Sequence, residues 1–392
     1  MRKSSFVAAF LAACFGGGEL IVACVGDDPT ARTADLSEAG PNVDAAPPSN
    51  DGGSDAADGA SSTDAAGDAA APLPPSCRSG TTGVTSCAGA AGCCTSPLVS
   101  SGMFNRTYQV TFQGPTNQAD PATVSAFRLD QYEVTVGRFR NFVHDITSAT
   151  GAPPTSGSGK HVHLNGGKGL ANAGSAGGFE QGWDSADWNF AIASGAASVD
   201  TWNTNLTGGT WTAGNEALPI SNVSWFEAVA FCIWDGGFLP SDAELEYAEA
   251  GGDAQRLYPW GSADPDPTCT GGCIYAVFGC NYPAPTPPAS CGIANIAPVG
   301  TTSKGYGRWG QLDLSGNVAE YTLDRGNTDI ASPYRGPCVD CAEANVAVGK
   351  GNGRTNRGGA FNVPLTLAPQ RFPSDPPLNR SPAIGFRCAR TP

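Results

Sequence analysis

The sequence predicts an α+β fold with little regular secondary structure, in a single domain that runs from residue 101 to residue 392. Two Ser-x-x-Glu sequences, beginning at Ser224 and Ser241, have the form of a capping box and predict two helix starts. Apolar and polar residues alternate from Phe127 to Thr135, which predicts a strand. The 52 glycines and 31 prolines of the whole chain favour turns and long loops between such elements.

The other elements of this domain follow from the same signals. Apolar residues recur at helical spacing from Val136 to Ile146, which predicts a helix. Gly and Ser dominate residues 151–178, a composition typical of a loop. The two capped helices should cover residues 225–234 and about 242–250. Six large aromatic side chains are expected to fix the core and its loops rather than form a binding stripe: Trp225, Trp234, Tyr247, Trp260, Trp309 and Tyr321.

The N-terminus has the layout of an export signal. Arg2-Lys3 precedes an apolar run from Phe6 to Phe15, which is too short to span a membrane. Ile21-Val22-Ala23-Cys24 then resembles a bacterial lipobox, in which Cys24 would be lipidated, although Leu11-Ala12-Ala13-Cys14 is a second possible lipobox. We therefore expect a lipoprotein signal peptide over residues 1–24, and an exported lipoprotein anchored to a membrane of the bacterial cell envelope.

Residues 25–76 are expected to form a disordered acidic tether. From Val25 to Pro75 there is no aromatic residue, and Ala, Asp, Ser, Gly and Pro dominate, so this segment cannot bury enough apolar surface to offset its ordering entropy. The segment contains ten acidic residues and one basic residue, Arg32, so it carries −9 of the chain's net charge of −14. This charge keeps a spacer extended, and no basic segment indicates a nucleic-acid partner.

The cysteines predict a disulfide framework. Of the 14 cysteines, twelve lie beyond Cys14 and Cys24, an even number in an exported chain. Residues 77–100 form a small Cys-rich segment, and a second group of cysteines crowds one insertion in the domain: Cys269, Cys273, Cys280 and Cys291. The pairing within these two groups does not follow from the sequence. The sequence Cys338-Val339-Asp340-Cys341 favours a local disulfide over a metal site in an oxidising compartment.

Four short motifs carry a family resemblance. They read Leu-Pro-Ser-Asp-Ala-Glu-Leu-Glu-Tyr-Ala at 239–248, Leu-Ser-Gly-Asn-Val-Ala-Glu-Tyr at 314–321, Arg-Gly-Gly-Ala-Phe at 357–361 and Gly-Phe-Arg-Cys-Ala at 385–389. Together they resemble the formylglycine-generating enzyme, or sulfatase-modifying factor, family over nearly all of the domain. The resemblance implies a distorted C-type-lectin-like α+β fold. It also implies a disulfide between Cys232 and Cys388.

The resemblance places an oxidase site where this chain lacks the reactive groups. Family enzymes oxidise a sulfatase cysteine with oxygen and a copper(I) ion held by two cysteines, which lie five residues apart just after Arg-Gly-Gly-Ser. Counted from Arg357, Ala360 stands at the serine, Val363 at the first cysteine and Ala368 at the second. Soft thiolates are the ligands that copper(I) prefers, so copper is not expected and no catalytic residue is assigned.

Calcium is the cofactor that the resemblance supports. In the family, a structural calcium ion is held at the Gly-Asn turn by backbone carbonyls and a Glu carboxylate, a set of hard oxygen ligands. The matching positions here are Ser315, Gly316, Val318 and Glu320. The alternative is a simple Gly-Asn turn with a surface Glu. A second family calcium site is expected to be lost, because residues 294–300 lack its spacer.

The remaining titratable residues suggest no further site. His161 and His163 could place two imidazoles on one face of a strand, but with only His144 to add and glycines around them, a solvent-exposed loop is expected. Three carboxylates near Ser241 are interpreted as charges that complement a helix macrodipole: Asp242, Glu244 and Glu246. No nucleophile elbow, phosphate loop or dinucleotide-binding motif is present.

These observations lead to one functional hypothesis and one alternative. The hypothesis is a monomeric, surface-anchored binding module for a peptide, protein or glycan that has lost copper oxidase chemistry. The alternative is a divergent oxidase that modifies a cysteine of a sulfatase-like substrate and holds its metal through Cys338 and Cys341.

Overall fold

The computed structural model defines the arrangement of most of the chain beyond residue 72. The residues it describes are 73–78, 87, 92–111, 114–173, 177–196, 198–263, 265, 274–283, 288–326, 334, 336–343, 353–368, 370 and 372–392. None of the helices in this part of the chain is long and apolar enough to cross a membrane. Cys14, Cys24 and the predicted tether up to residue 72 lie outside the described residues.

The three predicted helices are confirmed. Helix α1 covers Val136–Ile146, α4 covers Trp225–Trp234 and α5 covers Asp242–Ala250. Both capping boxes are formed, because each N-cap serine accepts the amide proton of the Glu three residues later, and that Glu accepts the amide proton of the serine. Further helices, which the sequence patterns did not predict, are α2 (Asn189–Ala196), α3 (Val199–Asn205) and the 3₁₀ turns η1 (Pro75–Cys77), η2 (Asn165–Gly167), η3 (Gly252–Ala254) and η4 (Ile293–Asn295).

Short strands form several small sheets, as expected for a fold with little regular structure. One sheet has the order β1 (Leu98–Val99), β4 (Phe127–Leu129), β12 (Ala389–Arg390). A second has the order β10 (Phe372–Asp375), β9 (Arg354–Arg357), β6 (Ala319–Arg325), β11 (Ile384–Gly385). A third joins β2 (Gly102–Thr111), β3 (Gly114–Val124) and β7 (Cys338–Val339), and a fourth pairs β5 (Ala171–Asn172) with β8 (Cys341–Ala342).

The strand predicted from Phe127 to Thr135 is shorter than expected, because β4 ends at Leu129. Beyond it the chain bends but stays attached to the C-terminal segment, since Val134 N donates to the Phe386 carbonyl at 2.9 Å. The bend accommodates Asp130 and Glu133, whose carboxylates are fully buried and need polar partners that a regular strand would not reach.

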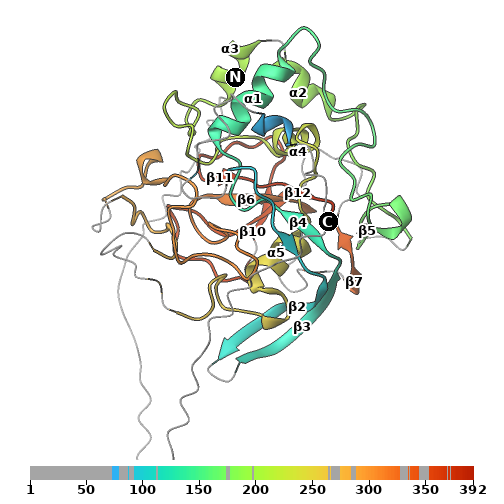
Figure 1. The fold of residues 1–392 in the computed structure, drawn as a ribbon, viewed down its shortest axis with the longest axis vertical. Helices are drawn as coiled ribbons and strands as arrows, with labels where there is room; N and C mark the ends of the chain where they lie inside the picture. The colour runs from blue at the N-terminus through green and yellow to red at the C-terminus, as the bar shows by residue number, and fades with distance from the viewer. Residues whose placement is uncertain are drawn as a thin grey trace, which may run out of the picture. The chain divides into compact units, whose positions relative to one another are not determined.

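The apolar side chains gather in two main clusters. The larger one surrounds α1 and α4, where the rings of Phe139 and Phe231 stack at 5.6 Å. The second lies between α5 and the β2–β3 hairpin, where Phe104 meets Tyr247 edge to face at 5.3 Å. Helices α1 to α4 lie toward one end of this body and the β2–β3 hairpin toward the other (Figure 1).

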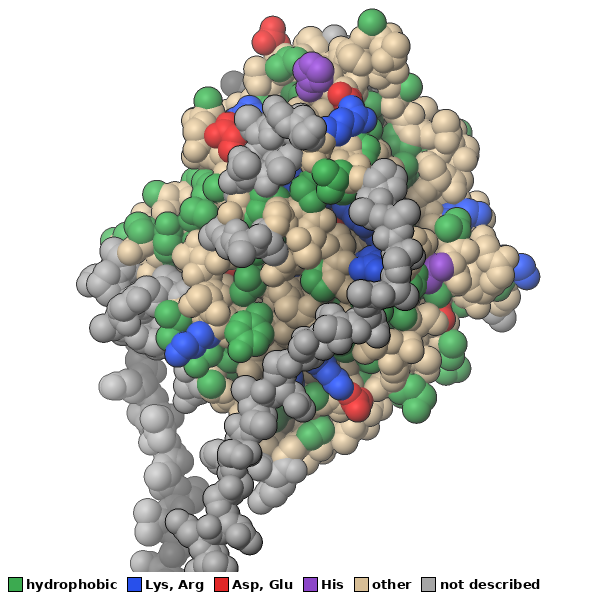
Figure 2. Space-filling model, viewed as in Figure 1, with side chains coloured by type: hydrophobic (Ala, Val, Ile, Leu, Met, Phe, Trp, Pro, Cys, Tyr) green, Lys and Arg blue, Asp and Glu red, His purple; other side chains and the backbone are tan. Residues whose placement is uncertain are grey.

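Many charged side chains of this body are buried rather than exposed. Among the described residues three arginines are fully buried, Arg138, Arg357 and Arg387, and each pairs with at least one buried carboxylate. On the face drawn in Figure 2, the visible charged side chains are correspondingly few and scattered. The ion pairs that position the candidate sites are therefore internal, where a charge without a partner is costly.

Candidate functional site

The RGG loop, residues Arg357–Ala368, carries the positions at which the family resemblance places copper. It begins at the end of β9 with Gly358 and Gly359. Their backbone φ angles are 82° and 72°, values that residues other than glycine rarely adopt. A Cβ on Gly358 would lie 2.9 Å from the Leu314 carbonyl oxygen, so the backbone segments around these two residues approach closely. Gly316 N donates to the Gly358 carbonyl at 2.8 Å, which fixes the loop to the neighbouring Gly-Asn turn.

The three family positions in this loop are closed by apolar packing. Ala360 and Ala368 are each 3% exposed, and Val363 packs against the larger core cluster. Gly279 N donates to the Val363 carbonyl at 2.9 Å, and Ala368 N donates to the Leu257 carbonyl at 3.0 Å. Methyl and isopropyl groups offer no ligand to copper(I), so the residues at these positions do not fit the ion.

Every cysteine in the described part of the chain is in a disulfide. The predicted bond between Cys232 and Cys388 is confirmed, with a Cα–Cα distance of 5.4 Å, and so is the local bond between Cys338 and Cys341. The others are Cys77–Cys94, Cys87–Cys93 and Cys280–Cys291. Cys269 and Cys273 lie outside the described residues. No described cysteine therefore offers a free thiolate to a metal ion.

The predicted calcium ligands lie together, but their carboxylate is already bound. Both oxygens of Glu320 accept hydrogen bonds from Arg387, at 2.6 and 2.7 Å. Val318 N donates to Glu133 at 3.1 Å, and Ser315 Oγ donates to a backbone carbonyl. A guanidinium beside the carboxylate repels a second cation, so this arrangement does not fit calcium at Glu320. Within the described residues no group of three His, Cys, Asp or Glu side chains has metal-binding geometry.

The carboxylates of α5 form a buried ion-pair cluster, so their interpretation as macrodipole charges is incomplete. Arg357 donates from Nη1 to Asp242 at 3.1 Å and from Nε to Glu249 at 3.0 Å. Tyr334 donates its hydroxyl to Glu246 at 2.9 Å. Burial raises the pKa of both Glu246 and Glu249 to about 8, because one guanidinium cannot balance three buried carboxylates. Arg357 Nη2 also donates to the Ala368 carbonyl at 2.7 Å, so the cluster holds the end of the RGG loop.

The expectation that His161 lies in a solvent-exposed loop is wrong. Its side chain is fully buried between two carboxylates, with Nδ1 at 3.0 Å from Glu180 and Nε2 at 3.1 Å from Glu244. Burial opposes the imidazolium charge, but Glu244 and Glu180 outweigh it and raise the pKa of His161 to about 10. Its ring also packs on Phe238 at 3.7 Å. The Gly-rich flanks hid these contacts, because the partners come from residues 19 and 83 positions away.

The other two histidines differ from His161. His163 is half-buried against Phe238, and burial lowers the pKa of His163. His144 lies at the exposed end of α1, with 84% of its side chain accessible. The three imidazoles therefore do not converge on one metal site.

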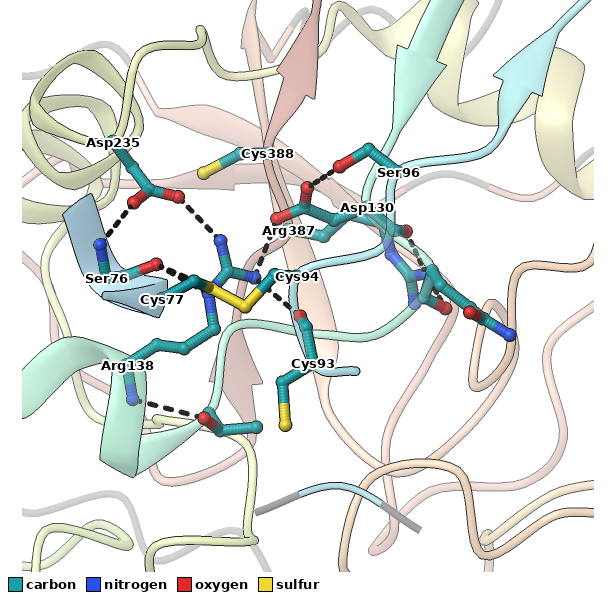
Figure 3. Close-up of polar contacts among 12 residues, drawn as sticks. Ser76, Cys77, Cys93, Cys94, Ser96, Asp130, Arg138, Asp235, Arg387 and Cys388 are labelled. Atoms are coloured by element: carbon teal, nitrogen blue, oxygen red, sulfur yellow. Dashed lines mark hydrogen bonds and ion pairs between the residues drawn. A yellow bond between two sulfur atoms is a disulfide. The ribbon is translucent and has the colours of Figure 1, made fainter. Parts of the chain in front are cut away.

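The segment before the domain forms an N-terminal clasp, defined by four residues: Ser76, Cys77, Cys93 and Cys94. Ser76, expected at the end of the disordered tether, instead lies in the turn η1 and is part of the folded body. Ser76 is fully buried, with its amide directed at Asp235 and its hydroxyl at Arg138 (Figure 3). Its amide donates to Asp235 at 2.9 Å, its hydroxyl accepts from Arg138 Nε at 2.9 Å, and its carbonyl accepts from Asn141 at 2.8 Å. The Cys77–Cys94 disulfide closes the clasp.

Arg138 is the centre of this network (Figure 3). Its guanidinium pairs with Asp130 at 2.9 Å and with Asp235 at 2.6 Å, and all three side chains are fully buried. Nη1 also donates to the Cys93 carbonyl at 3.4 Å. Although burial alone would raise it, Arg390 and Arg138 hold the pKa of Asp130 below its ordinary value. The sequence patterns did not identify these contacts, because they join residues from four separate segments.

An open pocket of about 320 Å³, with no residue of the RGG loop in its lining, lies between the start of α2 and the turn after β10. Phe226 is a buried wall, whereas Phe190 and Leu378 are 49% and 50% exposed at the rim. Asp187 supplies a carboxylate to the lining. Mostly apolar walls with a single charged group are typical of a small-ligand pocket.

Comparison with known proteins agrees with the motifs. The chain is 31% identical over 214 residues to formylglycine-generating enzyme of Streptomyces coelicolor, which covers 50% of this chain and 62% of that protein. It is 29% identical over 175 residues to inactive C-alpha-formylglycine-generating enzyme 2 of Mus musculus, covering 44% and 49% of the two chains. PvdO from Pseudomonas aeruginosa has a similar structure, with a TM-score of 0.44 and 18% identity over 75% of this chain and 93% of that chain.

These matches thus span less than two thirds of each curated relative. The model of the sulfatase-modifying factor enzyme 1-like domain matches residues 93–392, which include the RGG loop but not Ser76 or Cys77. Because this match covers more than half of the chain, the chain belongs to the sulfatase-modifying factor enzyme 1-like domain family.

Proposed function

We propose that this protein is an exported, lipid-anchored binding module that has lost copper oxidase chemistry and recognises a peptide, a protein or a glycan. The observation that carries the proposal is the replacement of the family's serine and two cysteines by Ala360, Val363 and Ala368. That a curated relative is named as an inactive formylglycine-generating enzyme supports it, since it indicates that the family contains members without the oxidase activity.

The chemistry of the loop supports the same conclusion. Copper(I) needs two soft thiolates, and the substrate thiolate must join them. Here the positions are apolar and well packed, while the surrounding glycines and Arg357 still fix the loop. The alternative oxidase rests on Cys338 and Cys341, and the disulfide between them leaves it without thiolate ligands.

The anchoring half of the proposal rests on the sequence. A lipidated Cys24 followed by an acidic tether would hold the folded body away from the membrane surface. The body needs no catalytic centre for such a role, and it would act as a monomer on its tether.

An anaerobic copper(I) titration against a chromogenic chelator tests the loss of chemistry. The full chain carrying Cys14→Ser and Cys24→Ser, which removes both possible lipidation sites, should bind no copper(I). The same chain with Val363→Cys and Ala368→Cys places cysteines at the two family positions and is the variant for comparison. Tight binding by the chain without these cysteines, or oxygen-dependent conversion of a cysteine peptide, would overturn the proposal.

A further inference from the structure

The pocket between the start of α2 and the turn after β10 has fixed apolar walls. They consist of two phenylalanines, two prolines, a leucine and an alanine, with Asp187 as the charged residue of the described lining. The rings of Phe190 and Phe226 meet edge to face at 5.8 Å, and Phe226 is buried against Trp225 at 5.3 Å. Trp225 N donates to the Pro377 carbonyl at 3.0 Å, which ties the turn to α4. The walls are therefore formed before any ligand binds.

This pocket is open to solvent and can hold one end of a ligand. Its volume of about 320 Å³ is at the lower end of the range for ligand pockets. Phe190 and Leu378 are 49% and 50% exposed at the rim. A free small molecule is usually enclosed over most of its surface, and this rim would leave much of one uncovered. The geometry thus favours a side chain whose backbone continues outside the pocket.

The polar groups at this pocket accept hydrogen bonds rather than donate them. Asp187 is exposed and supplies a carboxylate. The amides of Ala186 and Asp187 already donate to Asp184 Oδ1, at 3.0 and 3.2 Å. Pro376 and Pro377 have no backbone N–H to offer. A ligand must therefore bring its own hydrogen-bond donors.

The charge around the pocket favours a cation. Within the described part of the chain, Asp187 pairs with no basic side chain. Arg380, two positions after Leu378, donates to both oxygens of Glu227 at 2.6 and 2.7 Å, so its charge is already balanced. The chain as a whole carries a net charge of −14. Because the local and overall charges have the same sign, a cation is attracted to the pocket and an anion is repelled.

We propose that this pocket binds a lysine side chain presented by a peptide or protein partner. The proposal rests on the binding function proposed above and names the group that is recognised. The four methylenes of lysine would cover the apolar walls, as long charged side chains commonly do. Its ammonium group would donate to Asp187 and make a cation–π contact with Phe190.

Lysine fits these groups better than the other candidate ligands. Arginine presents five N–H donors in a fixed fork, and the described lining offers one carboxylate to accept them. A glycan needs donors for its ring and hydroxyl oxygens, and the side chains of the described lining supply none. An acidic side chain would be repelled by Asp187.

An NMR titration tests the proposal with the full chain carrying Cys14→Ser and Cys24→Ser. The probe is the tripeptide Ala-Lys-Ala, acetylated and amidated at its ends. The matched peptide contains norleucine in place of lysine, which keeps the methylenes and removes the charge. The lysine peptide should bind at least about tenfold more tightly than the norleucine peptide. Its affinity should also fall as salt is added.

Two pairs of variants locate the binding site. Asp187→Asn should weaken binding of the lysine peptide at least about fivefold. Asp200→Asn removes an exposed carboxylate from α3, outside the described lining, and should leave binding unchanged. Phe190→Ala should also weaken binding, whereas Val199→Ala, at a residue that is exposed to a similar extent on α3, should not. All four side chains are exposed, so the variants should fold like the parent.

Several results would overturn the proposal. They are no binding of the lysine peptide, equal binding of the norleucine peptide, tighter binding of an arginine peptide or of butylammonium, and equal effects of Asp187→Asn and Asp200→Asn. The acidic segment before the domain is the same in every variant, so its attraction for cations cancels in these comparisons. The copper(I) titration measures the loss of oxidase chemistry separately, so a failure there would be distinct from a failure here.

Discussion

The RGG loop and the N-terminal clasp differ in two respects: whether they lie in the segment that matches the family, and whether their key residues make polar contacts. The loop lies inside the matched family segment, yet its three functional positions, Ala360, Val363 and Ala368, carry no polar side-chain group. In the clasp, Ser76 and Cys77 lie outside that segment, yet every polar group of Ser76 is bound by buried residues of the domain.

The difference shows that the backbone of this fold can be kept while the reactive side chains it carries in the family are replaced. In the loop, glycine conformation and the Arg357 cluster preserve the backbone path after the reactive groups have been replaced. In the clasp, a segment outside the family match is part of the folded body, because Ser76 donates to the buried Asp235 and accepts from the buried Arg138. A family match therefore defines neither the limits of the folded body nor its activity.

The largest effect is expected from Arg138→Ala in the clasp. The substitution leaves the buried Asp130 and Asp235 with Arg390 as their one remaining guanidinium partner, which should lower the free energy of unfolding by about 3–5 kcal/mol. Urea denaturation followed by tryptophan fluorescence measures it. Arg140→Ala on the same helix is the matched control, since its ion pair with Glu216 is partly exposed and should cost about 1 kcal/mol or less. Equal effects of the two substitutions would contradict the central role of Arg138.

Opening the Cys77–Cys94 bond should have the next largest effect. The bond closes a loop with a sequence separation of 17, for which the chain-entropy model gives about 3 kcal/mol, so Cys77→Ser/Cys94→Ser should lower the unfolding free energy by about that amount. The paired control Cys87→Ser/Cys93→Ser opens a separation of 6 and should cost about 2 kcal/mol. If the Cys77 variant unfolds at the same urea concentration as the parent, the clasp does not stabilise the domain.

The cluster that holds the RGG loop should make stability depend on pH. Burial raises the pKa of Glu246 and Glu249 to about 8, so between about pH 4.5 and about pH 8 the folded state binds more protons and stability falls as pH rises. His161 acts in the same direction from about pH 6.5 to about pH 10. Urea denaturation across this range should show a decline that Glu246→Gln makes shallower. A rise in stability toward alkaline pH would contradict these shifts.

The smallest effect on stability is expected from restoring cysteines to the RGG loop. Val363→Cys and Ala368→Cys are small volume changes, so unfolding should shift by about 1 kcal/mol or less per site. Copper(I) binding by this variant would show that the scaffold still positions the two sites. If the variant is stable but binds no copper(I), the loop has lost its geometry as well as its ligands.

Local sequence signals predicted three helices of the fold and the position of one strand. The bounds of α1, α4 and α5 follow from capping boxes and helical spacing, which act over a few residues and are independent of tertiary contacts. The strand predicted over residues 127–135 ends at Leu129. Beyond it the backbone bends, and the buried carboxylates of Asp130 and Glu133 bind their polar partners there, which the alternating pattern did not indicate. The motifs identified the family, and they located its empty oxidase positions by counting from Arg357.

The sequence by itself thus determined the family, the local helices, the disulfides Cys232–Cys388 and Cys338–Cys341, and the missing reactive groups. Only the tertiary structure decided how the charged residues pair. It buried His161 between Glu180 and Glu244, bound Glu320 to Arg387, and joined Ser76 to Arg138. The physical reason is that these partners lie between 19 and 83 positions apart in the sequence, and whether a charge is buried depends on the packing of distant segments.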